Sequence, residues 1–121
     1  MELQGKTALI TGGARRVGRG ITLAFAQAGA NVVINYNSSS ADAVQTAHDA
    51  EAMGVQALPV QADVSDYDQV GSMVDQAVAR FGTIDILVNN ASVFLPDPLP
   101  TDDLTIWRKS IDTLVHGPFY C

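Results

Sequence analysis

The segment Thr11-Gly12-Gly13-Ala14-Arg15-Arg16-Val17-Gly18 decides the fold of this chain. It follows an apolar stretch, residues 6–11, that predicts a short β-strand, and it precedes apolar residues at helical spacing, namely Ile21, Ala24, Phe25 and Ala28. A helix that begins at such a turn points free backbone N–H groups back toward the turn, and glycine lets an anion approach the backbone closely. The segment therefore predicts a phosphate-binding unit of strand, turn and helix, with a plain glycine-rich connection as the alternative.

The rest of the chain alternates between apolar strands and amphipathic helices. Further strands are predicted at residues 32–34, 56–61 and 85–90. Helices are predicted at about residues 41–53, over a segment that Ser65 can cap and Gly82 ends, and from about residue 102 onward. This alternation, with short connections, is typical of a parallel sheet with right-handed crossovers.

The composition of individual strands predicts their places in the sheet. Pro59 cannot donate to a ladder, which places the third strand at an edge. Ile86, Leu87 and Val88 form a continuous apolar run, typical of a parallel strand covered on both faces. We expect a doubly wound α/β sheet in the order 3-2-1-4 that is incomplete at its C-terminal side. The fourth strand would be an apolar edge that further chain or a partner subunit covers.

The net charge of −6 argues against a general nucleic-acid or acidic-membrane surface. Arg15, Arg16 and Arg19 nevertheless lie close together, which favours a local anion site over the alternative of a solvated helix face. A single cysteine and two histidines predict no disulfide and no metal site, and they favour a reducing cytoplasm. No stretch approaches the roughly 20 apolar residues of a membrane span, and no signal-peptide pattern is seen.

Three motifs resemble the short-chain dehydrogenase/reductase family, whose glycine pattern is T-G-x-x-x-G-x-G. The matching residues are Thr11, Gly12 and Gly18, then Asp63 and Val64 after the third strand, then Asn89, Asn90, Ala91 and Ser92 after the fourth. The resemblance covers the whole chain, which corresponds to the first half of a typical member. It implies a Rossmann-type fold in which residues 1–121 form the NAD(P)-binding portion of a single-domain reductase.

The resemblance also implies which residues meet the cofactor. Asp63 and Val64 would lie beside the adenine, and Asn90 and Ala91 along the ribose, although Asp63 could instead only tether the next helix. The expected cofactor-binding residues are Gly12, Arg15, Arg16, Val17, Gly18, Tyr36, Asn37, Ser38, Asp63, Val64, Asn90 and Ala91.

Charge near the second strand favours NADP(H) over NAD(H). An acidic side chain there would bind a ribose 2′-hydroxyl and repel a 2′-phosphate. Residues 35–38 contain no carboxylate. Arg15 and Arg16 can offer planar, charge-assisted donors to a phosphate. NADP(H) is therefore the expected cofactor.

One departure from the family pattern bears on the substrate. Arg16 replaces the middle glycine. This variant resembles the pteridine reductase branch of the family, in which an arginine at this position can reach both cofactor phosphate and substrate. By the same resemblance, Phe94 would stack on a flat heterocycle opposite the nicotinamide and Ser92 would hydrogen-bond nearby. The alternative is that Phe94 anchors a loop on the core.

The family's catalytic pair is missing from this sequence. Members reduce a carbonyl or imine by hydride transfer, with a tyrosine supplying the proton and a lysine four residues later. Neither Lys6 nor Lys109 follows a tyrosine at that spacing, so no catalytic residue is expected within this chain. Leu114 stands where the family has an asparagine that supports a proton-relay water, unless the alignment is misplaced by one residue.

Three hypotheses follow. The leading one is an NADPH-dependent reductase of a small carbonyl or pterin-like substrate, represented by its N-terminal half and expected to form a homo-oligomer. The alternative is a non-catalytic NADP(H)-binding or dimerising half-domain that pairs through the fourth strand. A methyltransferase with the same sheet is disfavoured, because those enzymes usually place an acid after the second strand.

Overall fold

The computed structural model describes residues 2–93 and 104–121, which build a four-stranded parallel sheet. Its strands are β1 (Thr7–Ile10), β2 (Asn31–Tyr36), β3 (Ala57–Gln61) and β4 (Ile86–Val88). They lie in the order β3-β2-β1-β4, which confirms the predicted order and the Rossmann-type arrangement. Pro59 lies in the edge strand β3, opposite Ile34, as its missing N–H predicts.

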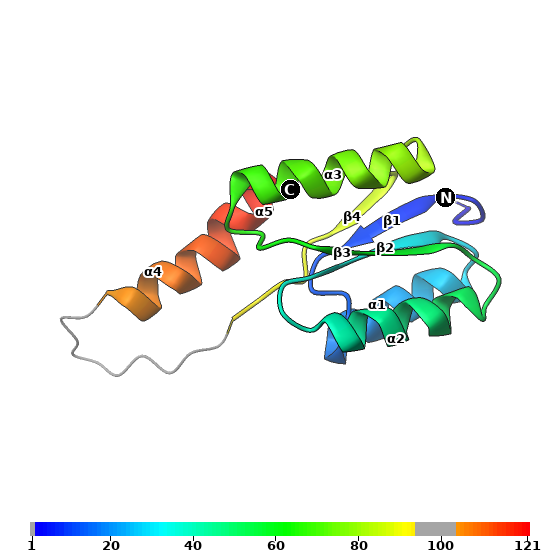
Figure 1. The fold of residues 1–121 in the computed structure, drawn as a ribbon, viewed down its shortest axis with the longest axis horizontal. Helices are drawn as coiled ribbons and strands as arrows, with labels where there is room; N and C mark the ends of the chain where they lie inside the picture. Colours follow the sequence, from blue (N-terminus) through cyan, green and yellow to red (C-terminus); the bar gives the residue numbers. More distant parts are fainter. Residues whose placement is uncertain (1, 94–103) are drawn as a thin grey trace.

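Helices cover both faces of this sheet (Figure 1). They are α1 (Arg16–Gln27), α2 (Ser40–Glu51), α3 (Tyr67–Phe81), α4 (Thr105–Ile111), the π-helical turn η1 (Asp112–His116) and α5 (Gly117–Tyr120). The first two lie on one face, and α3 lies on the other with α5 at its N-terminal end. The predicted helix start near residue 102 falls outside the described residues.

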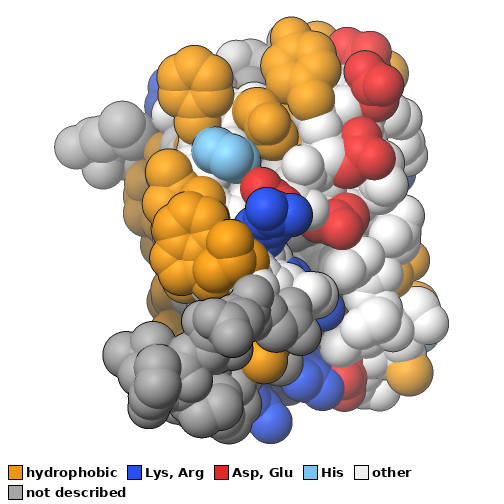
Figure 2. All heavy atoms as spheres, turned by 90° about the vertical axis from the view of Figure 1, so that its left-hand side faces the viewer, with side chains coloured by type: hydrophobic (Ala, Val, Ile, Leu, Met, Phe, Trp, Pro, Cys, Tyr) orange, Lys and Arg blue, Asp and Glu red, His pale blue; other side chains and the backbone are white. Residues whose placement is uncertain are grey.

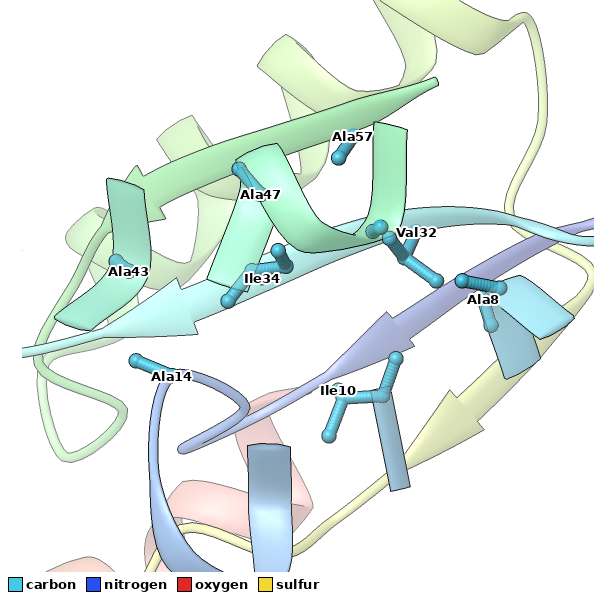
Figure 3. Packing of buried hydrophobic residues seen from close by; sticks show 10 residues of the cluster. Ala8, Ile10, Ala14, Val32, Ile34, Ala43, Ala47 and Ala57 are labelled. Atoms are coloured by element: carbon cyan, nitrogen blue, oxygen red, sulfur yellow. The ribbon is translucent and has the colours of Figure 1, made fainter. Parts of the chain in front are cut away.

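Alternation along β1 divides the core into two clusters. Ala8 and Ile10 are fully buried against α1 and α2, whereas Leu9 packs toward α3. Figure 3 shows alanines of α2, among them Ala43 and Ala47, against the sheet. Because alanine is small, the helix backbone comes close to the strands and to the turn that follows β1.

Two predictions about individual elements were wrong. Ser65 does not cap α3, because the side chain of Asp66 accepts hydrogen bonds from the N–H groups of Asp68 and Gln69. Nor is β4 covered on both faces within the described residues: Leu87 is 39% exposed, although Ile86 and Val88 pack against the cluster under α1. The sheet order explains the second difference, since β4 pairs with β1 alone.

Candidate functional site

A cleft of about 810 Å³ opens at the carboxyl ends of the strands. This is where parallel α/β sheets bind their ligands. All twelve residues expected to meet the cofactor line it, and so does Ser92. Phe94 lies outside the described residues. The structure thus brings four separate segments of the chain to one cleft.

Tight packing at the glycine-rich turn brings its backbone to the floor of this cleft. Gly12 has φ +61°, and its N–H donates to Asn35 Oδ1 at 3.1 Å. A Cβ on Gly18 would overlap the Gly12 carbonyl oxygen and lie 2.7 Å from Asn90 Nδ2. Glycine at position 18 therefore lets α1 begin directly against the end of β1.

A second set of hydrogen bonds joins this turn to the end of β4. Thr11 Oγ1 accepts from the N–H groups of Asn90, at 2.9 Å, and Ala91, at 3.0 Å. Asn90 Nδ2 donates to the Gly12 carbonyl oxygen at 3.2 Å. The motif after the fourth strand therefore holds the turn in shape, in addition to lining the cleft.

The three arginines of the turn separate in the structure. Arg15 and Arg16 are exposed and line the cleft, and Arg16 adopts φ +54°, a conformation that suits glycine. Arg19 instead forms an ion pair with Asp49 on α2. The hydrogen bond from Arg19, and to a smaller extent the one from Gln45, holds the pKa of Asp49 below its ordinary value. Of the three arginines expected to form an anion site, Arg15 and Arg16 line the cleft and Arg19 does not.

The end of β2 forms a polar wall of the cleft. Tyr36, Asn37 and Ser38 line it, and Gln61 Nε2 holds Asn37 through two hydrogen bonds of 3.2 Å. Residues 35–39 carry no carboxylate. This wall therefore offers hydroxyl and amide groups, without negative charge, to whatever lies between it and the arginines.

Asn35 is a structural residue of the site that sequence reasoning did not assign. It is 2% exposed, and its side chain accepts from Gly12 N and donates to the Ala62 carbonyl at 3.0 Å. The signal was a polar residue at the end of an apolar strand, which must find partners when buried.

Asp63 has the tethering role that was raised as the alternative, and it also lines the cleft. Its Oδ1 accepts from Ser65 N at 2.9 Å and Ser65 Oγ at 2.6 Å, while its N–H donates to Gln69 on α3. Neighbouring Val64 is buried, and it lies so near Gly117 that a Cβ there would come within 2.8 Å of it. These contacts fix this side of the cleft.

The last helices add residues to the cleft that the motifs did not indicate. They are Thr105, Arg108, Lys109, Asp112 and Thr113. Local sequence could not reveal them, because their place depends on where α4 and η1 lie relative to the carboxyl ends of the strands. Leu114, which we expect at the family's asparagine position, lies in the π-helical turn and is 46% exposed. Within residues 2–93 and 104–121, no helix is long and apolar enough to cross a membrane.

Comparison with known proteins places this geometry in a family. The short chain dehydrogenase model matches residues 6–121. The 3-oxoacyl-(acyl-carrier-protein) reductase FabG of Staphylococcus aureus is 39% identical over 116 residues, which make up 96% of this chain and 47% of that protein.

Solved structures agree. A blue fluorescent protein from a metagenomic library, in complex with NADPH, superposes with a TM-score of 0.91 at 37% identity, over 99% of this chain and 49% of that one. A mutant short-chain dehydrogenase/reductase from Serratia marcescens gives a TM-score of 0.93 at 33% identity, with the same coverage. The chain therefore spans about half the length of these relatives. Since the family model covers the sequence from strand β1 to its last residue, this chain belongs to the short-chain dehydrogenase family.

Proposed function

We propose that this chain is the dinucleotide-binding part of an NADPH-dependent oxidoreductase. The observation that carries the proposal is the convergence of the glycine-rich turn, two exposed arginine side chains and an uncharged β2 end on one cleft. The NADPH complex of a structural relative and the family membership support it. The chain carries a net charge of −6, yet its turn presents Arg15 and Arg16. This local positive charge suits a ligand that carries several phosphate groups.

The residues of the cleft suit the parts of such a cofactor. The N-terminal N–H groups of α1 would meet the pyrophosphate, because free N–H groups at a helix N-terminus bind anions. Glycine at position 18 allows α1 to begin close to the turn, where a Cβ would overlap the Gly12 carbonyl oxygen. Arg15 and Arg16, with Tyr36, Asn37 and Ser38, would hold the 2′-phosphate. Bound there, the nicotinamide cofactor would supply the hydride.

The same cleft has further groups for the adenosine. Asp63 and Val64 would lie by the adenine, and Asn90 and Ala91 along the ribose. Each of these four residues is already held by the hydrogen bonds or packing described above. A preformed wall loses little conformational entropy when the ligand binds.

The proposed substrate is a small carbonyl compound or a pterin-like heterocycle. Arg16 occupies the position that suggested a pteridine reductase, and exposed Ser92 lines the same cleft. The tyrosine and lysine that would protonate the product are expected in sequence beyond these 121 residues. A cytoplasmic location is part of the same proposal.

The protein is further proposed to form a homo-oligomer. Figure 2 shows hydrophobic side chains gathered on the face that carries α4, η1 and α5. Trp107 is 53% exposed, Val115 54% and Phe119 86%. Apolar patches of this kind mark interaction surfaces. A non-catalytic, dimerising half-domain remains the alternative, and the exposed edge of β4 is the feature that favours it.

Isothermal titration of the purified protein with NADPH, NADH and S-adenosylmethionine tests the proposal. NADPH should bind most tightly, and Arg15→Ala should weaken NADPH more than NADH. Arg80→Ala, which removes an exposed arginine from α3, is the matched control and should leave both affinities unchanged. Tighter binding of NADH than of NADPH would overturn the assignment. Binding of NADPH by the purified 121-residue chain as a stable dimer without turnover would favour the half-domain.

A further inference from the structure

Two buried threonines donate hydrogen bonds to backbone carbonyl groups of the glycine-rich turn. Thr22 Oγ1, on α1, donates to the Gly13 carbonyl at 3.0 Å. Thr46 Oγ1, on α2, donates to the Ala14 carbonyl at 2.7 Å. Both threonines are completely buried. Thr46 is the more informative of the two, because it reaches the turn from a different helix.

Peptide planarity gives this contact a consequence for the cleft. In a trans peptide the C=O and the following N–H point in opposite directions. A hydrogen bond that draws the Ala14 carbonyl toward α2 therefore turns the Arg15 N–H away from α2. Ala14 and Arg15 both line the cleft, and Arg15 directly precedes the first residue of α1. The Thr46 hydroxyl thus sets the direction of an amide donor at the proposed phosphate site.

Arg19 determines which way the Thr46 hydroxyl donates. Its Nη1 donates to Thr46 Oγ1 at 2.9 Å, so the oxygen serves as acceptor there and keeps its single proton for Ala14. A threonine inside a helix can otherwise donate to a carbonyl of its own preceding turn. Asp49 and Gln45 complete the arrangement, since Asp49 accepts from both Arg19 and Gln45.

We propose that Thr46, oriented by Arg19, is a positioning residue that holds the Ala14–Arg15 peptide with its N–H toward the dinucleotide phosphates. This role rests on the proposed function. Arg15 and Arg16 would contact a phosphate with their own side chains. Arg19 would instead act on the phosphate indirectly, through Thr46 and the Ala14–Arg15 peptide. NADPH and NADH share the pyrophosphate, so loss of the contact weakens both to the same extent.

The test is titration of the full-length protein and its Thr46→Val variant with NADPH and with NADH, well below the unfolding temperature. Valine keeps the shape of threonine and removes the hydroxyl. It should raise both dissociation constants about tenfold, which corresponds to about 1.4 kcal/mol, and leave their ratio unchanged. Thr46→Ser, which keeps the hydroxyl, should bind within about twofold of wild type.

The outcomes separate this role from the function on which it rests. Wild-type protein that binds neither nucleotide overturns the proposed function. Wild-type protein that binds NADPH, together with Thr46→Val protein of equal affinity, overturns the positioning role alone, even if the variant unfolds at a lower temperature. If Thr46→Val does not fold, Arg19→Met serves instead, since Arg19 is partly exposed. It should weaken both nucleotides about threefold, and an unchanged affinity contradicts the proposal.

Discussion

Arg16 keeps a guanidinium at the cleft at some cost in stability. Its φ of +54° lies in the left-handed region, where an L-residue with a Cβ is less stable by roughly 1–2 kcal/mol. Glycine, which the family pattern has at this position, adopts the same conformation without that cost. Arginine at this position therefore places a positive charge at the cleft at the expense of the stability of the turn.

Arg16→Gly should separate these two effects. The free energy of unfolding should rise by about 0.5 kcal/mol, because relief of the left-handed backbone is partly offset by the greater freedom of glycine in the unfolded chain. Affinity for NADPH should fall about ten- to a hundredfold, since a hydrogen bond to a charged group contributes about 1.5–3 kcal/mol. Urea denaturation and calorimetric titration measure the two. Arg16→Ala is the control: it should lose affinity without gaining stability, and a gain in stability from both variants would contradict the backbone argument.

Gly18 and Gly20, both in α1, should respond oppositely to alanine. A Cβ on Gly18 would overlap the Gly12 carbonyl oxygen, whereas a Cβ on Gly20 meets nothing within 4 Å. Gly18→Ala should lower the free energy of unfolding by about 1–3 kcal/mol, as overpacking does, and weaken NADPH binding. Gly20→Ala should raise it by about 0.5–1 kcal/mol, because alanine is the better helix former. Thermal and urea unfolding of the two variants decide the point, and equal effects would mean that the turn is looser than described.

Residues that local motifs single out line the candidate cleft. The glycine-rich turn and the residues that end β2, β3 and β4 lie in short motifs whose chemistry is legible without a structure. Asn35, Thr46 and the α4 residues of the cleft were not predicted, because their roles come from partners far along the chain. The ion pair of Arg19 was not predicted for the same reason: its partner Asp49 is on another helix.

The capping of α3 illustrates the scale of a single element. Asp66 accepts hydrogen bonds from two free N–H groups of the first turn, and Gln69 Nε2 donates back to it at 3.1 Å. Asp66→Ala should therefore lower the free energy of unfolding by about 1 kcal/mol. Asp75→Ala removes an exposed carboxylate from the same helix without touching a cap, and should change stability by less than about 0.5 kcal/mol. Equal losses, measured by urea denaturation, would show that Asp66 acts through its charge alone.

The type of each element was predicted more accurately than the residues at which it begins and ends. Apolar runs and helical periodicity identified the four strands and the first three helices, because burial of one face dictates both patterns. The end of a helix depends instead on which of several adjacent polar residues turns its side chain onto the first free N–H groups. Ser65 and Asp66 are both good caps, and Ser65 is drawn to Asp63 in the folded chain. That choice is tertiary and could not be read from the sequence.

For the whole molecule, the two faces of the sheet are completed to different extents. Leu9 on β1 and Leu87 on β4 are paired in register, so their side chains emerge on the same face, toward α3. Leu9 is 2% exposed, whereas Leu87 is 39% exposed. The difference arises because β1 lies between two strands and β4 has a neighbour on one side alone. The relatives are about twice as long as this chain, which is consistent with further chain covering β4.

The paired leucines therefore measure how far β4 is covered. In the 121-residue chain, Leu9→Ala should lower the free energy of unfolding by about 2–5 kcal/mol, as buried leucines do. Leu87→Ala should cost about 1 kcal/mol, because much of its side chain already meets solvent. In the full-length protein, where we expect another strand beside β4, the cost of Leu87→Ala should rise toward that of Leu9→Ala. If Leu87→Ala still lowers the free energy of unfolding by only about 1 kcal/mol in the longer chain, β4 remains a free edge there. If the loss is large and depends on protein concentration in the 121-residue chain, a second copy covers β4.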